Sequence, residues 1–155
     1  MTYELLLYAH IIGACVLIGT GAGIAFFFVL SNHWGNAAMI AHVGRIVVLA
    51  DTVFTATAFI FQPITGFFLA REIGWPLTDS WLLASLILYV VVGIFWLPVV
   101  WIQIRLRDIA HEAVETNSSL PSTYRSLYRI WLIFGFPAFI AIMLIVWLMI
   151  SKPDF

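Results

Sequence analysis

The sequence has little charge and almost no cysteine. Charged residues make up only 10% of the 155-residue chain, whereas soluble domains contain about 25%. This composition excludes an ordinary water-soluble domain. A single cysteine, Cys15, excludes an intrachain disulfide and a zinc site built from cysteines. The net charge is −1 and the sequence has no basic cluster, so nucleic-acid binding is excluded as well.

Recognised catalytic motifs are also missing. The sequence contains no nucleophile elbow, phosphate-binding loop, HExxH zinc motif, CxxC pair or dinucleotide-binding glycine pattern. The spacing of serine, histidine and aspartate does not indicate a triad. The residues therefore leave open whether the protein is an enzyme.

What the chain has in abundance is hydrophobic sequence, which accounts for 63% of its residues. Four apolar runs have about 20 residues or more, so each can cross roughly 30 Å of hydrocarbon as a helix. We predict an all-α fold, a four-helix transmembrane bundle in one domain that covers residues 1–155. The first run has no basic leader, so we expect it to be a retained helix. The helices are expected at about residues 3–30, 38–70, 81–104 and 130–150.

Basic residues predict how the bundle is oriented. The link between the third and fourth runs carries Arg105, Arg107, Arg125 and Arg129. The link between the second and third runs has one arginine, and the C-terminal tail has one lysine. Basic links stay in the cytoplasm, so we expect the arginine-rich link inside and both termini outside. Four helices enclose little volume, and we therefore expect a homo-oligomer in the lipid bilayer.

The second run contains a stripe of polar and small residues. At 100° per residue, its members lie within about 40° of Asp51 in a helical projection. A central aspartate costs at least about 2.5 kcal/mol on insertion scales, so the stripe should face protein or water. Asp51 could be a structural hydrogen-bonding group, a proton-relay carboxyl or an ion ligand. The stripe consists of Asp51, Thr55, Ala58, Gln62 and Thr65.

The third run has a matching face. Its members lie within about 40° of one direction, and the tyrosine and tryptophan need hydrogen-bond partners. This face could line a polar cleft, satisfy Asp51 or simply pack. It consists of Ser85, Tyr89, Val92, Trp96, Val99 and Gln103. The polar interior that we predict comprises Arg45, Asp51, Thr55, Gln62, Thr65 and Tyr89, with Arg45 near the cytoplasmic end, where it can reach the interface.

Three further features concern local structure within and at the ends of the runs. Pro63 lies inside the second run and cannot donate to the carbonyl of Phe59, so it is a candidate kink. The stretch 31–36 is expected to be a turn. Several tryptophans near the run ends, Trp131 among them, fit the membrane interface.

His10 is the residue in the first run with the most chemical potential. A histidine inside an apolar helix needs a hydrogen-bond partner or a metal. One hypothesis is a hydrogen bond to Gln62 or Thr65, which lie at similar depth. The other is ligation of a metal, with His10 as an axial ligand of haem iron. Met143 lies at a suitable depth on the fourth run to be the second axial ligand.

Several stretches together resemble a bacterial family of predicted four-helix integral membrane proteins. They are YAHIIGACVLIGTGAGIAFF (8–27), RIVVLADTVFTATAFIFQPITGFFLA (45–70) and WLPVVWIQIRLR (96–107), followed by YRSLYRIW, GFPAF and WLMISKP. The resemblance covers nearly the whole chain. It implies this fold and a place in the bacterial inner membrane, and it implies no particular chemistry.

The opening helix is more distantly similar to the copper-resistance D and HemJ-type membrane proteins. In the HemJ-type proteins a histidine of the first helix ligates b-type haem, which implies that His10 does so here. Those oxidases also use a membrane-flanking lysine, whereas the one lysine here is Lys152 in the tail. The likeness therefore does not extend to porphyrinogen oxidation.

Two functional hypotheses follow. The first is a small haem-b-binding membrane protein that works in electron transfer or redox chemistry, with a quinone or another redox partner near the polar stripe. The second is a non-enzymatic transport or scaffold component, in which Asp51 and Gln62 satisfy each other or contact a solute.

Overall fold

The computed structural model describes residues 2–34 and 36–154. These residues form α1 (Thr2–His33), α2 (Ala37–Ala50), η1 (Asp51–Thr55), α3 (Ala56–Ile73), α4 (Ser80–Glu115) and α5 (Ser122–Ser151), with no strand among them. Because α2, η1 and α3 follow one another without a break, the fold has four long helices, and each is apolar enough to span a membrane. The predicted all-α, four-helix transmembrane bundle is confirmed.

The helices are longer than the apolar runs that predict them. α4 continues to Glu115, and α5 begins at Ser122, inside the arginine-rich link. The eleven residues beyond Ile104 add about 16 Å to α4 at 1.5 Å per residue. α1 continues to His33, into the stretch expected to be a turn, and Gly35 of that stretch lies outside the described residues. Hydropathy thus located the spans, whereas the helices continue past them.

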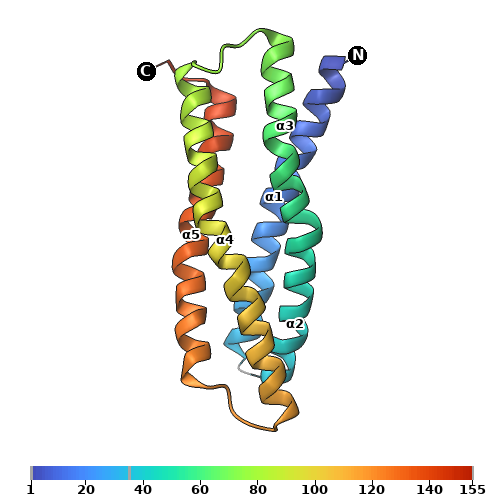
Figure 1. Cartoon of the computed structure of the whole chain (residues 1–155), viewed down its shortest axis with the longest axis vertical. Helices are drawn as coiled ribbons and strands as arrows, with labels where there is room; N and C mark the ends of the chain where they lie inside the picture. The colour runs from blue at the N-terminus through green and yellow to red at the C-terminus, as the bar shows by residue number, and fades with distance from the viewer. Residues whose placement is uncertain (1, 35, 155) are drawn as a thin grey trace.

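Neighbouring helices run in opposite directions, and both termini lie at one end of the bundle (Figure 1). The α1–α2 and α4–α5 connections lie at the opposite end, which we call the arginine end after the four arginines of the α4–α5 region. α1 packs along α2 and α3, whereas α4 packs along α5 and crosses α2. α1 and α5 have few close backbone approaches and meet through side chains toward the arginine end, where Phe28 packs on Trp131 and Tyr124 donates to Asn32. We call the line along which these two helices face each other the α1–α5 seam.

The largest buried core lies toward the arginine end. It contains Phe28, Ile40, Leu106, Ala110 and Trp131, and a smaller core around Trp81 and Leu82 lies near the termini. Most of the remaining apolar surface points outward; Ile150, for example, is 78% exposed. In water such a surface would aggregate, whereas in a bilayer it contacts acyl chains.

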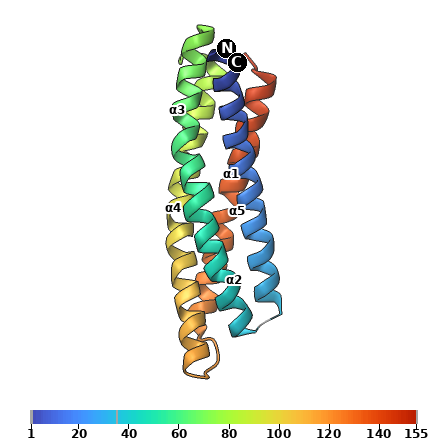
Figure 2. The same cartoon turned by 90° about the vertical axis from the view of Figure 1, so that its right-hand side faces the viewer.

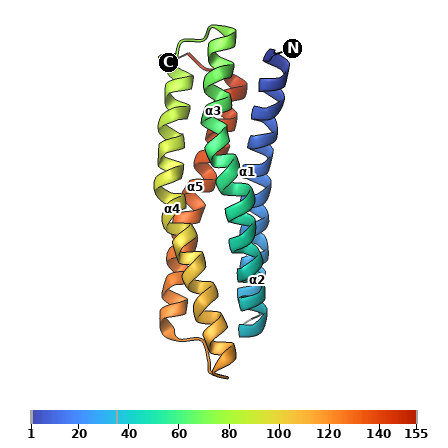
Figure 3. The same ribbon diagram turned by 45° about the vertical axis from the view of Figure 1, so that its right-hand side comes forward.

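The second span is irregular at the polar stripe. Between Asp51 and Thr55 the helix widens into a π turn, and the Ala56 N–H donates to the carbonyl of Asp51, five residues back. Figures 2 and 3 show this span as one continuous helix in which α2 and α3 are not collinear. The helix passes through Pro63 without interruption, so the irregularity lies at residues 51–55 rather than at the predicted kink.

Candidate functional site

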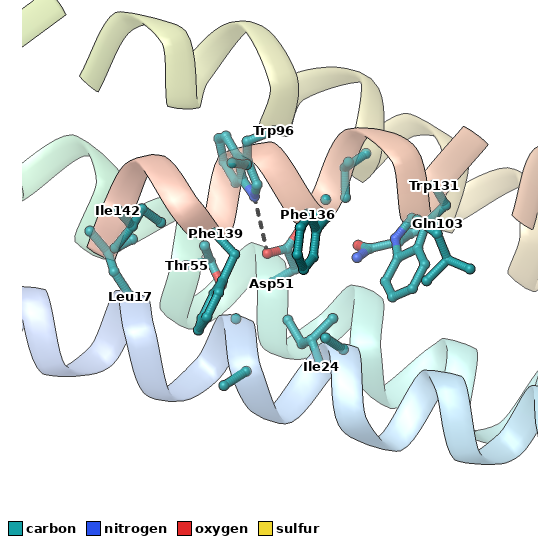
Figure 4. Close-up of a pocket in the computed structure, with 17 residues that line it drawn as sticks. Leu17, Ile24, Asp51, Thr55, Trp96, Gln103, Trp131, Phe136, Phe139 and Ile142 are labelled. Atoms are coloured by element: carbon teal, nitrogen blue, oxygen red, sulfur yellow. Dashed lines mark hydrogen bonds between the residues drawn. The ribbon is translucent and has the colours of Figure 1, made fainter. Parts of the chain in front are cut away.

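Asp51 is the centre of a buried hydrogen-bonded cluster. It is 3% exposed, and Trp96 of α4 donates from Nε1 to its Oδ1 over 3.3 Å. The Gln103 amide satisfies both of its neighbours when its nitrogen donates to Asp51 Oδ2 over 3.2 Å and its oxygen accepts from Trp131 Nε1 over 3.1 Å. Each carboxyl oxygen thus has one donor. Figure 4 shows the four side chains, which come from three spans.

Helical spacing explains why these side chains meet. Trp96 and Gln103 are seven residues apart, so they lie two turns apart on one face of α4. Asp51 and Thr55 are four residues apart and share the inward face of the second span, and both are buried. Trp131 lies on the face of α5 that packs against α4. The expectation that the α4 face satisfies Asp51 is confirmed for Trp96 and Gln103.

A cavity of about 260 Å³ adjoins this cluster. We call it the Asp51 cavity. Asp51, Thr55 and Gln103 line it, and its other walls are almost entirely apolar. Its rim includes Phe136, which is 69% exposed, and Ala22 of α1. Both α1 and α5 line the cavity, and the exposure of Ala22 and Phe136 places its mouth at the α1–α5 seam, on the apolar outer surface.

Thr55 is the least satisfied polar group in the Asp51 cavity. Its Oγ1 is buried and makes no hydrogen bond of good geometry with the described residues, although it lies close enough to the Asp51 carboxyl to interact with it. A buried hydroxyl without a partner costs about 1–3 kcal/mol. Thr55 is therefore the group that a bound molecule would satisfy most readily.

The remaining polar residues of the stripe form a second, separate cluster. His10 Nδ1 shares a hydrogen bond of 2.9 Å with Thr65 Oγ1, and Gln62 Nε2 donates to the backbone carbonyl of His10 over 3.1 Å. The hypothesis that His10 bonds to Gln62 or Thr65 is confirmed. Gln62 lies eleven residues after Asp51, or about 16 Å along the helix. The two side chains therefore do not satisfy each other, which corrects that part of the second hypothesis.

Close backbone approach holds α1 against α3 at this second cluster. A Cβ added to Gly66 would lie 3.1 Å from His10 Cε1, and a Cβ added to Gly13 would collide with Gln62 Oε1. The imidazole therefore lies directly against the backbone of α3.

Tyr89 has a role that depends on Pro63. The prolyl nitrogen carries no hydrogen, so the helix leaves the carbonyl of Phe59 without its usual donor. The hydroxyl of Tyr89 donates to this carbonyl from α4, and the Tyr89 and Phe59 rings stack with centroids 4.7 Å apart. Tyr89 thus lies in the polar interior as predicted, but it supports the backbone and does not contact Asp51.

Two predicted site residues lie outside these clusters. Arg45 is exposed on α2, so it is not part of the polar interior. This fits its reaching the interface, because its face of α2 points away from the bundle. Met143 is 36% exposed on α5, whereas His10 packs against α3. Within the described residues, no group of three or more His, Cys, Asp and Glu side chains could hold a metal ion.

Trp131 is the site residue that sequence reasoning missed. Its position near the start of the fourth apolar run predicts an interfacial tryptophan instead. A usable signal was present: together with Gly135, Ala138 and Ile142 it recurs at helical spacing on one face of α5, and all four line the Asp51 cavity.

Comparison with known proteins adds family membership and no chemistry. Residues 4–153, nearly the whole chain, match the model of a family described as "Predicted integral membrane protein (DUF2269)". No curated protein and no solved structure shows a significant match.

Proposed function

The chain belongs to the DUF2269 family of predicted integral membrane proteins, and we propose that it binds a lipophilic molecule carrying a hydroxyl-bearing ring, as a reduced quinone does. The observation that carries the proposal is the Asp51 cavity: an apolar space with a few polar groups at one side that opens toward lipid. Binding sites for small molecules have this composition. A ligand would enter from the bilayer through the α1–α5 seam.

Hydrogen bonding favours a ligand that donates. A carboxylate has about four acceptor positions, and Asp51 uses two of them for Trp96 and Gln103. Thr55 adds a hydroxyl of its own. Both indole N–H groups of the site are already engaged, and the Gln103 amide already donates to Asp51. A ring hydroxyl can therefore donate to Asp51 and also bond to Thr55.

The size of the cavity limits the ligand. Pockets for drug-sized ligands have about 300–1,000 Å³, and this one has about 260 Å³. It accommodates one ring, and an attached apolar tail would lie in the α1–α5 seam among the exposed side chains of α1 and α5.

Binding of a short-chain quinol to the purified protein in nanodiscs, measured by calorimetry, tests this proposal. Gly135→Val should abolish binding, because Gly135 lines the cavity and a Cβ there has no atom within 4 Å, so the side chain fills space without disturbing the helices. Gly19→Val is the matched control, since its Cβ is equally unobstructed and lies outside the cavity. Asp51→Asn should weaken binding about tenfold, which is about 1.4 kcal/mol.

Unchanged affinity in Gly135→Val would contradict binding in this cavity. If Gly135→Val and Gly19→Val lose the same amount of quinol affinity, the loss comes from a general disturbance of helix packing and not from filling the Asp51 cavity.

Haem b ligated by His10 is a second proposal. It is supported by the bond from Nδ1 to Thr65, which orients the ring and leaves Nε2 as the nitrogen for iron. It comes second because a macrocycle at His10 requires α1 and α3 to separate at Gly66. A Soret band in protein expressed with added haem, lost in His10→Ala and kept in His42→Ala, would support it. If the protein is colourless and no quinol binds, the transport or scaffold hypothesis remains.

A further inference from the structure

We propose that the arginine end carries a binding site for the phosphate headgroup of an anionic phospholipid. A cavity of about 680 Å³ lies between the end of α1, the start of α2 and the start of α5. We call it the Arg125 cavity. Arg125, Arg129, Ser118 and Ser119 contribute polar groups to its wall. This proposal is independent of the ligand proposed for the Asp51 cavity.

The charge of the Arg125 cavity is uniformly positive. Arg125 and Arg129 are four residues apart on α5, so they lie one turn apart on one face. None of the described residues that line the cavity is acidic. Arginine matches phosphate oxygens with its planar array of donors. The cavity therefore suits a phosphate group and is unsuited to a cation.

The other polar side chains that line the Arg125 cavity are of two kinds, those already hydrogen-bonded and those with a hydroxyl left to donate. Tyr124 donates to Asn32 over 2.6 Å, and Asn32 donates to the carbonyl of Phe28 over 2.8 Å, so this pair stiffens the wall. Tyr128 and Ser119 also line the cavity, and their hydroxyls make no hydrogen bond of good geometry with the described residues. They can donate to the same phosphate as the arginines.

The depth of the Arg125 cavity identifies a lipid as the source of the phosphate. Arg129 immediately precedes the apolar run 130–150, and Arg125 lies about 6 Å farther out along α5. The headgroup layer adds roughly 5–8 Å to each side of the hydrocarbon core. Both guanidinium groups can therefore reach the level of lipid phosphates.

The floor of the cavity also suits a lipid. Leu132 and Ile40 line its deeper part, and Leu132 lines the Asp51 cavity as well. Leu132 is also exposed on the outer surface of α5, so an acyl chain attached to the bound headgroup can lie against it and against the exposed Ile133 and Phe136.

Native mass spectrometry of the purified protein, with phosphatidylglycerol, phosphatidylcholine or inorganic phosphate added, tests this inference. We expect phosphatidylglycerol to bind at least about fivefold more tightly than phosphatidylcholine, as about 1 kcal/mol per basic residue implies. Arg125→Gln and Arg129→Gln should each remove most of this preference. Arg105→Gln is the matched control, because Arg105 is exposed at the same end of the bundle but does not line the cavity.

Equal losses in all three variants would overturn the site, because they would indicate general attraction to a basic surface. Displacement of phosphatidylglycerol by millimolar inorganic phosphate would overturn the assignment to a lipid. All three arginines are at least partly exposed, and circular dichroism of each variant verifies that the helices are retained.

Discussion

At the scale of single residues, Asp51 shows how this bundle accommodates a carboxyl inside a membrane. Its two oxygens accept from Trp96 and Gln103, and Gln103 in turn accepts from Trp131. A charged residue at the centre of a span costs about 2.5–3.5 kcal/mol on insertion scales. Two donors on α4 offset this cost, and Trp131 of α5 holds one of them in place, so the aspartate links the second span to the third directly and to the fourth through Gln103.

Tyr89 provides a residue-scale prediction. Tyr89→Phe should destabilise the bundle by about 0.5–1.5 kcal/mol, because the carbonyl of Phe59 then loses the donor that replaces the missing N–H of Pro63. The ring stacking on Phe59 is kept in this variant. Thermal unfolding in detergent measures the effect. Tyr8→Phe, at a residue that is 65% exposed, should change nothing, and equal behaviour of the two variants would contradict the role of Tyr89.

Much of the polar interior could be predicted from the sequence, because helical spacing alone places residues on a face. The stripe from Asp51 to Thr65 and the face from Ser85 to Gln103 both turn inward. Spacing could not show that the stripe divides into two clusters, since this depends on which helix each part meets. It also could not distinguish Trp131 from a tryptophan at the interface, because a position near the end of a span suits both.

At the scale of elements, the wide turn at Asp51–Thr55 is a feature that no sequence pattern indicates. Proline and glycine are the usual signals of helix irregularity, and DTVFT contains neither. Asp51 and Thr55 at its two ends are both buried against the neighbouring spans. π turns are frequent at functional sites, and here the turn borders the Asp51 cavity.

The α1–α3 contact provides a prediction at this scale. Gly13→Val should destabilise the protein by about 1–3 kcal/mol, because overpacking displaces Gln62 from the backbone of His10. Gly19→Val introduces the same side chain into the same helix where nothing lies within 4 Å. The difference in unfolding free energy between the two variants measures the cost of the contact. A difference near zero would mean that the close contact of α1 with α3 at Gly13 does not contribute to the free energy of unfolding.

Helix ends were less predictable than helix centres. Hydropathy places the third span at 81–104 because Arg105 begins a hydrophilic stretch, whereas α4 continues to Glu115. Ala110 and Ala113 are buried in that extension, so packing against α5 and the connecting segment keeps it helical. Composition marks where the membrane ends, and packing decides where the helix ends.

At the scale of the whole molecule, the even number of spans places both termini together (Figure 1). The four arginines of the α4–α5 region lie at the other end, so the positive-inside rule predicts a cytoplasmic arginine end. In a Cys15→Ser background, an impermeant maleimide applied to intact bacterial cells should label Asp154→Cys. Ser118→Cys should react only after the membrane is opened. The opposite labelling pattern would reverse the proposed orientation.

The division of the bundle has a consequence for its biogenesis. α1 packs on α2 and α3, α4 packs on α5, and the Asp51 cluster and the contact of α2 with α4 join the halves. Each half is a helical hairpin that can insert before the other is made. Co-expressed fragments 1–76 and 77–155 should therefore reassemble and co-purify, and Asp51→Leu should reduce their recovery. If the two fragments never associate, the four spans must be synthesised as one chain in order to assemble.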